Sequence, residues 1–148
     1  MMRIVVKGGM FMPKKSMLQF NGYTVNEILF KATPQCENVK EFSIQTNFQQ
    51  QVIECADETY DVTLSVDIAS TDEHPMPFDL RVSITGHFSY QESAEDIPVG
   101  SKETILSTNT AAILFPFLRA IVASVTTNAN VPPLLLPIMN FAAGKSSS

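Results

Sequence analysis

The chain has 148 residues, 45% of them hydrophobic and 17% charged, with a net charge of −5. A chain of this length forms about one domain and buries enough surface to fold without a disulfide or a metal ion. Its acidic balance, concentrated in residues 41–148, argues against nucleic acid as the main partner. Acidic surface around apolar grooves would favour basic, hydrophobic partners, unless the acids simply keep the protein soluble.

The first predicted element is a long, irregular strand over residues 17–32, which follows a basic stretch at residues 1–16. Apolar residues alternate along it, but their phase slips twice. The apolar pairs are Leu18 and Phe20, then Tyr23 and Val25, then Ile28 and Phe30. We expect β-bulges near Gly22 and Asn26, because a bulge inserts one residue and shifts the phase.

Three further strands are predicted, over residues 41–49, 59–70 and 77–90. The first of them is a short alternation after a loop opened by Pro34. The other two alternate strictly between apolar and polar residues, which indicates one buried and one solvated face. They are expected to form a hairpin at the centre of an antiparallel sheet.

A helix is predicted from about Leu114 to about Thr127, after an exposed acidic connection and a cap within residues 107–110. The start is placed there because Pro116 is tolerated best in a first turn. Two apolar ridges run along this helix and make a stripe wider than one sheet contact needs. The ridges are Ile113, Phe117, Ile121 and Val125, and beside them Leu114, Leu118 and Val122.

The segment after the helix is predicted to be an extended loop, because three prolines within residues 131–141 exclude a helix or a central strand. It carries six large apolar residues: Leu134, Leu135, Leu136, Ile138, Met139 and Phe141. Exposing all of them would forgo about 1.5–3 kcal/mol each. Some of them must therefore be buried, against the fold or against a partner.

The sequence offers no catalytic motif, so we do not expect an enzyme or a cofactor. His74 lies in a turn and His87 on a polar strand face, and no nucleophile is placed near either. Cys36 and Cys55 lack the spacing and neighbours of a metal site and are predicted to be free thiols. No signal peptide and no uninterrupted membrane span are recognised, which predicts a cytoplasmic protein without a membrane partner.

The stretch "ILFPFLRAIVASV", followed by "PPLLLPIMNF", resembles the C-terminal signature of SecB-type export chaperones. Upstream, "YTVNEILFKATP", "TYDVTLSVDIAS" and "FDLRVSITGHFSY" are similar to the first, third and fourth strands of that family. The resemblance implies an α+β fold, a four-stranded antiparallel sheet with a long C-terminal helix on one face, the second helix being truncated or absent. It divides the chain into an extension (1–16), a chaperone domain (17–142) and a short flexible tail (143–148).

The resemblance also implies an ATP-independent holdase that binds unfolded clients, assembled as a homotetramer, a dimer of dimers with the long helices at its interface. Client contacts carried over from the family are Val39, Phe42, Ile44, Phe48, Leu134, Leu136, Ile138 and Phe141. Interface residues are Phe117, Leu118, Ile121, Val122 and Val125. On the helix, one ridge would then meet its own sheet and the other a second subunit.

Two family roles remain open, and the chain's short ending "AAGKSSS" bears on them. Typical members continue with a second helix and a tail that docks on the SecA motor, so docking by that route is in doubt here. We therefore favour a dedicated client, such as the antitoxin of a toxin–antitoxin–chaperone system, over general export of preproteins. A structural oligomer whose apolar loop only mediates assembly is the alternative of another class.

Overall fold

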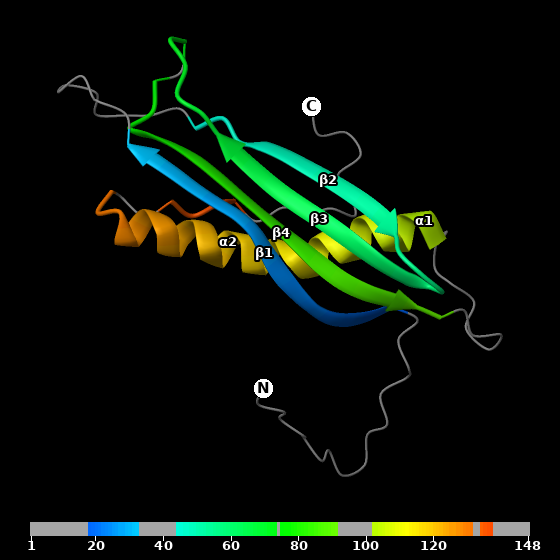
Figure 1. Cartoon of the computed structure of the whole chain (residues 1–148). Coiled ribbons are helices and arrows are strands. Elements are labelled where there is room, and N and C mark those ends of the chain that lie inside the picture. Colours follow the sequence, from blue (N-terminus) through cyan, green and yellow to red (C-terminus); the bar gives the residue numbers. More distant parts are fainter. Residues whose placement is uncertain (1–17, 33–43, 74, 92–101, 132–133, 138–148) are drawn as a thin grey trace.

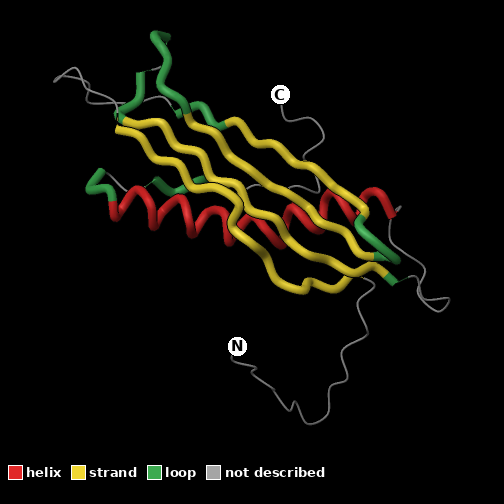
Figure 2. Tube along the Cα trace, viewed as in Figure 1, coloured by secondary structure: helices red, strands yellow, loops and turns green. Residues whose placement is uncertain are grey.

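The computed structural model describes residues 18–32, 44–73, 75–91, 102–131 and 134–137 (Figure 1). Four antiparallel strands form one sheet in the order β1-β4-β3-β2, and the helical segment covers one face of it (Figures 1 and 2). The strands are β1 Leu18–Ala32, β2 Asn47–Glu54, β3 Thr59–Ile68 and β4 Phe78–Tyr90. The predicted fold, a four-stranded antiparallel sheet with one long C-terminal helix packed on it, is confirmed.

The hairpin of β3 and β4 forms the centre of the sheet, as its strict alternation predicts. Side chains that share the helix-side face of both strands are almost fully buried: Tyr60, Val62, Leu64, Val66, Ile68, Phe78, Leu80, Val82, Ile84, Phe88 and Tyr90. The intervening residues are polar and form the outer face of the sheet. The core therefore lies between this hairpin and the helix.

Strand β1 contains both predicted bulges. Its register with β4 shifts between Phe20 and Tyr23, where Gly22 has a φ of 104°, and again between Val25 and Glu27. Positive φ of this kind is sterically cheap only for glycine. Because of the two shifts, every apolar pair noted in the sequence lies opposite a helix-side residue of β4, as Ile28 does opposite Val82.

Strand β2 lies further along the chain than predicted. Residues 44–46 are outside it, and it continues through the glutamine run to Glu54. Its position is set by antiparallel pairing with β3, from Asn47 opposite Asp67 to Glu54 opposite Tyr60. Backbone pairing to a central strand thus outweighs the local pattern that favoured residues 41–49.

The helix begins at Lys102, well before the predicted start at Leu114. It consists of α1 Lys102–Thr104, a π-helical turn η1 Ile105–Asn109 and α2 Thr110–Asn128, so Pro116 lies in the helix interior. A proline there removes one backbone hydrogen bond. The early turns are stabilised by burial instead, because Ile105 and Leu106 pack with the aromatic rings of Tyr60 and Tyr90.

By length and composition, the continuous helix Lys102–Asn128 could cross a membrane, whereas the sequence predicted no apolar stretch that long. In the structure it is the core helix. Its central ridge, Leu114, Leu118 and Val122, is completely buried against the sheet. This packing accounts for the apolar character of that ridge, whereas only 39% of the most apolar part of the helix is buried.

The chain leaves α2 through a tight turn that reverses its direction. Asn130 adopts a left-handed conformation with φ of 60°, and its N–H donates to the carbonyl of Thr127. The N–H of Val131 donates to the carbonyl of Thr126 at 3.3 Å. These two bonds define a Schellman motif, which satisfies the last helical carbonyls and directs the chain back toward the core.

Candidate client-binding and assembly surfaces

The connector, defined here as residues 134–137, packs two of its three leucines into the core. The side chains of Leu134 and Leu136 are 9% and 0% exposed, whereas Leu135 is 66% exposed. The N–H of Leu134 donates to the hydroxyl of Thr126, 2.9 Å away, and that hydroxyl donates in turn to the carbonyl of Val122. The completely buried Thr126 therefore positions the connector beside the end of α2.

Two of the predicted client contacts, Leu134 and Leu136, are thus buried in the isolated chain, and their role in client binding stays a prediction. An extended chain points alternate side chains to opposite sides, so burying Leu134 and Leu136 leaves Leu135 to face solvent. Sequence reasoning proposed the two buried residues as client contacts and omitted the exposed one. The alternation was visible in the sequence, but which phase faces inward depends on the turn at Asn130 and the bond to Thr126.

The client contacts predicted upstream of β3 are only partly described. Ile44 is exposed, whereas Phe48 is half-buried and its ring centroid lies 5.9 Å from that of Phe115. Phe48 packs against the core cluster that also contains Leu134 and Leu136. Val39, Phe42, Ile138 and Phe141 lie outside the described residues, as do the proposed extension 1–16 and tail 143–148.

The predicted interface residues on α2 separate into two groups. Leu118 and Val122 are completely buried against the chain's own sheet, so no surface of theirs is free for a second subunit. Phe117, Ile121 and Val125 are half-buried at the flank of the core. The helix position explains the division, because these two sets of residues lie on adjacent ridges.

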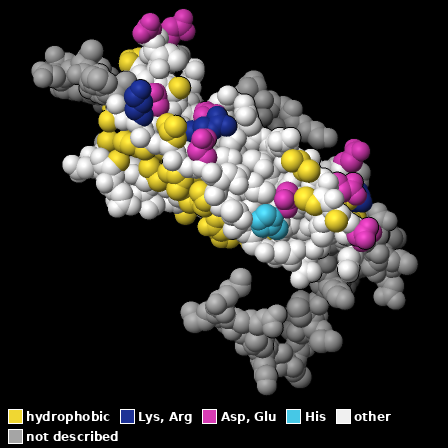
Figure 3. Space-filling view, viewed as in Figure 1, with side chains coloured by type: hydrophobic (Ala, Val, Ile, Leu, Met, Phe, Trp, Pro, Cys, Tyr) yellow, Lys and Arg dark blue, Asp and Glu magenta, His cyan; other side chains and the backbone are white. Residues whose placement is uncertain are grey.

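The half-buried ridge continues into apolar side chains of β1, and together they form what we call the β1–α2 band. Its members are Tyr23, Val25, Ile28, Phe117, Ile121 and Val125. The rings of Tyr23 and Phe117 are 4.7 Å apart and join the two elements. Hydrophobic side chains gather along the β1 edge in the space-filling view (Figure 3).

The sequence predicted no role for the β1 part of this band. The bulges turn Tyr23, Val25 and Ile28 toward the helix side of the sheet, but α2 does not cover them, and each is at least 38% exposed. Strand β1 is also an edge strand. Phase slips in the sequence predicted the bulges, but only the helix position shows that these residues remain uncovered.

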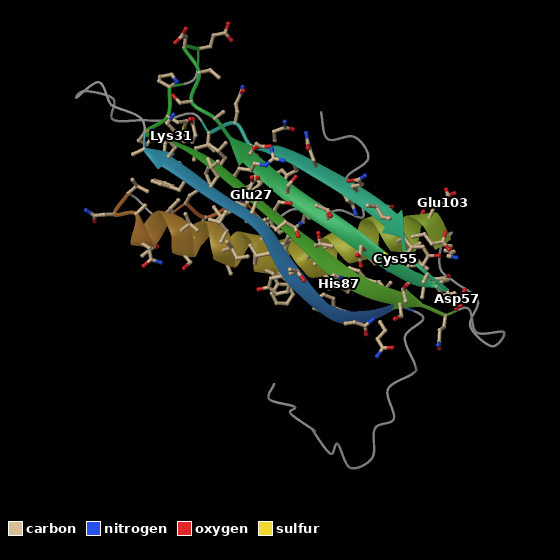
Figure 4. The ribbon with its side chains drawn as sticks, viewed as in Figure 1. Glu27, Lys31, Cys55, Asp57, His87 and Glu103 are labelled. Carbon is tan, nitrogen blue, oxygen red and sulfur yellow. The ribbon has the colours of Figure 1, made fainter. Side chains whose placement is uncertain are left out.

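The outer face of the sheet is polar and internally hydrogen-bonded. His87 lies on this face (Figure 4). Its Nδ1 is 2.8 Å from Oδ1 of Asp61, and its Nε2 is 2.9 Å from Oγ1 of Thr24. Arg81 pairs with Asp67 at 3.0 Å and with Glu27 at 2.6 Å. These groups thus form hydrogen bonds and ion pairs with one another on the outer face of the sheet. The described residues contain no cluster of three or more potential metal ligands.

The sequence matches the SecB family, described as preprotein translocase subunit SecB, over residues 16–144. This chain belongs to the SecB family. Proteins of the SecB family are cytoplasmic chaperones and not enzymes, which confirms the prediction that the chain has no catalytic activity.

Protein-export SecB proteins, an archaeal protein and solved structures are similar to this chain. The protein-export protein SecB of Anaplasma marginale is 39% identical over 90 residues, which cover 61% of this chain and 50% of that protein. The chain thus spans about half the length of that relative. An uncharacterized protein of Methanocaldococcus jannaschii is 29% identical over 133 residues, covering 88% of this chain and 83% of that protein.

Among the similar solved structures is that of the Mycobacterium tuberculosis SecB-like chaperone Rv1957, in complex with a ChAD peptide from the Rv1956 HigA1 antitoxin. It matches with a TM-score of 0.65 at 15% identity and covers 83% of this chain and 91% of that one. The likeness confirms the SecB fold of this chain.

Proposed function

We propose that this SecB family protein is an ATP-independent holdase that binds unfolded or aggregation-prone polypeptides through its apolar surfaces. The observation that supports this function best is the amount of apolar side chain left exposed on an acidic domain. The exposed large hydrophobic residues are Tyr23, Val25, Ile28, Leu29, Ile44, Val52, Ile53 and Leu135. These residues lie on β1, on β2 and in the segments 44–46 and 134–137, and exposed apolar surface beyond single scattered side chains is typical of binding sites.

The proposed client is a dedicated one, such as the antitoxin of a toxin–antitoxin–chaperone system. Support comes from the shared fold with a SecB-like chaperone whose structure contains an antitoxin peptide. General export of preproteins is the second candidate, favoured by the 39% identity to a protein-export protein SecB. The site for either client would include Ile44 and Leu135, which are exposed in the two segments that the family resemblance assigns to client binding.

The β1–α2 band is proposed to be an interface between copies of this chain in a homotetramer, a dimer of dimers. Among the described residues, β1 is an edge strand of the sheet, and the adjoining band contains no charged side chain. Both features favour pairing with a second copy.

The holdase function is tested by diluting a denatured, slow-folding protein into buffer without nucleotide and recording light scattering. We expect this chain to suppress aggregation at a stoichiometric dose. A parallel assay with an antitoxin and with a preprotein tests which client is bound more tightly. Unchanged scattering with every client at full dose would contradict the proposal.

The alternative of a structural oligomer is favoured by the burial of Leu134 and Leu136, since a connector sealed into the core offers less surface to a client. Sedimentation and a fluorescent hydrophobic dye distinguish the two functions. A sealed assembly would bind little dye, whereas a holdase keeps dye-accessible apolar surface in its oligomeric form.

A further inference from the structure

The connector is held mainly by two buried side chains and hardly at all by its backbone. Among the described residues, the only hydrogen bond of residues 134–137 is the one from the N–H of Leu134 to the Thr126 hydroxyl. The connector has no regular secondary structure, and its last residue is Pro137, which has no N–H to donate. A segment fixed by so few backbone bonds opens locally at a lower cost than a paired strand.

The site that receives the connector has the features of a peptide-binding groove. It accepts two aliphatic side chains two positions apart, Leu134 and Leu136, while the side chain between them points to solvent. It also supplies a buried acceptor, the Thr126 hydroxyl, to the backbone N–H of the first of these residues. An extended polypeptide of any origin presents this combination of alternating side chains and a backbone donor.

We propose that the connector is an internal occupant of a client groove and that a client segment displaces it. The groove takes an extended segment with aliphatic side chains at positions i and i+2 and a backbone N–H free at position i. This inference rests on the proposed holdase function and specifies which clients fit. Because the connector competes for the same site, clients bind only to molecules in which the connector has opened. The apparent affinity for clients is therefore the intrinsic affinity multiplied by the fraction of open molecules.

The displacement is tested with a synthetic, unlabelled peptide of residues 131–138, "VPPLLLPI", and the isotopically labelled full chain. Amide exchange at Leu134 is followed by NMR with and without a saturating dose. We expect the peptide to bind and the protection of the Leu134 amide to fall several-fold. Binding with unchanged or increased protection would overturn the proposal, as would no binding at all. The control peptide, with serine at both buried leucine positions, should not bind.

A pair of adjacent substitutions gives a second test. Leu136→Ala removes a side chain that holds the connector closed, whereas Leu135→Ala changes one that faces solvent. We expect the first variant to bind the "VPPLLLPI" peptide about tenfold more tightly and the second to bind it like the parent chain. Unchanged or weaker binding by Leu136→Ala would contradict displacement.

Two further outcomes are kept apart by the aggregation assay. If the parent chain suppresses aggregation but the Leu134 amide stays protected when peptide binds, only the proposal that clients displace the connector is contradicted. If it suppresses no aggregation, the holdase function itself fails. Should Leu136→Ala not fold, the exchange measurement on the parent chain still decides.

Discussion

The absence of a side chain at Gly86 sets how closely the helix approaches the sheet. Gly86 lies on the helix-side face of β4, between the buried residues Ile84 and Phe88. A Cβ atom at this position would come within 2.5 Å of Leu114 Cδ2 and 2.7 Å of Phe88 Cε2. Only a glycine therefore lets α2 approach β4 this closely, a role that the alternation pattern of the strand does not reveal.

We predict that Gly86→Ala destabilises the fold by about 1–3 kcal/mol, as overpacking of a rigid core does. Leu114 is completely buried, so its side chain cannot move aside into solvent. Thermal or urea unfolding measures the change. The control is the same substitution in a Leu114→Ala background, where the added methyl should cost much less. Equal costs in both backgrounds would show that the contact with Leu114 is not the cause.

At the scale of the elements, the sequence predicted best where pattern alone determines structure. The alternation of β3 and β4 gave their extents and faces, and the phase slips of β1 gave both bulges. It failed where tertiary packing outweighs local preference. Burial of Ile105 extends the helix past a proline, and pairing with β3 shifts β2 toward Glu54.

The candidate site follows the same division. The apolar nature of the connector and of the two helix ridges was predictable from residue types. Which leucine of the connector faces solvent, and which ridge meets the sheet, were not, because both depend on the path of the chain in space. The turn at Asn130 fixes that path for the connector, and the turn cannot be predicted from the spacing of apolar residues.

We predict that Asn130→Val lowers stability by about 1–2 kcal/mol, because a β-branched residue is strained in the left-handed conformation. Asn130→Gly should be neutral or slightly stabilising, since glycine adopts this φ freely. Both are measured by thermal unfolding. Asn128→Ala is the matched control, because Asn128 is also exposed but lies within α2. A similar loss in Asn130→Val and Asn128→Ala would contradict a special role for this turn.

At the scale of the whole molecule, α2 covers only part of the sheet and leaves apolar side chains of the edge strand β1 exposed. Within the part of the chain that the structure describes, β1 ends the sheet, and on the helix side its apolar residues continue the ridge of Phe117 without a covering element. On the other side of the same strand, Leu29 lies opposite Arg81 on the polar face. A charge introduced on the helix-side face of β1 is therefore expected to affect assembly differently from a charge introduced on its polar face.

Ile28 and Leu29 test those predictions, because they are neighbours with similar exposure, 50% and 45%, on opposite faces of β1. Ile28→Lys places a charge in the β1–α2 band, and we expect it to shift the sedimentation of the chain from the tetramer to a smaller species, since an unpaired charge is costly to bury in an apolar interface. Leu29→Lys places the same charge on the polar face near Asp67 and Glu27 and should leave the oligomer intact. Sedimentation velocity measures both. If the two variants dissociate equally, or neither does, the helix-side band is not the contact between subunits.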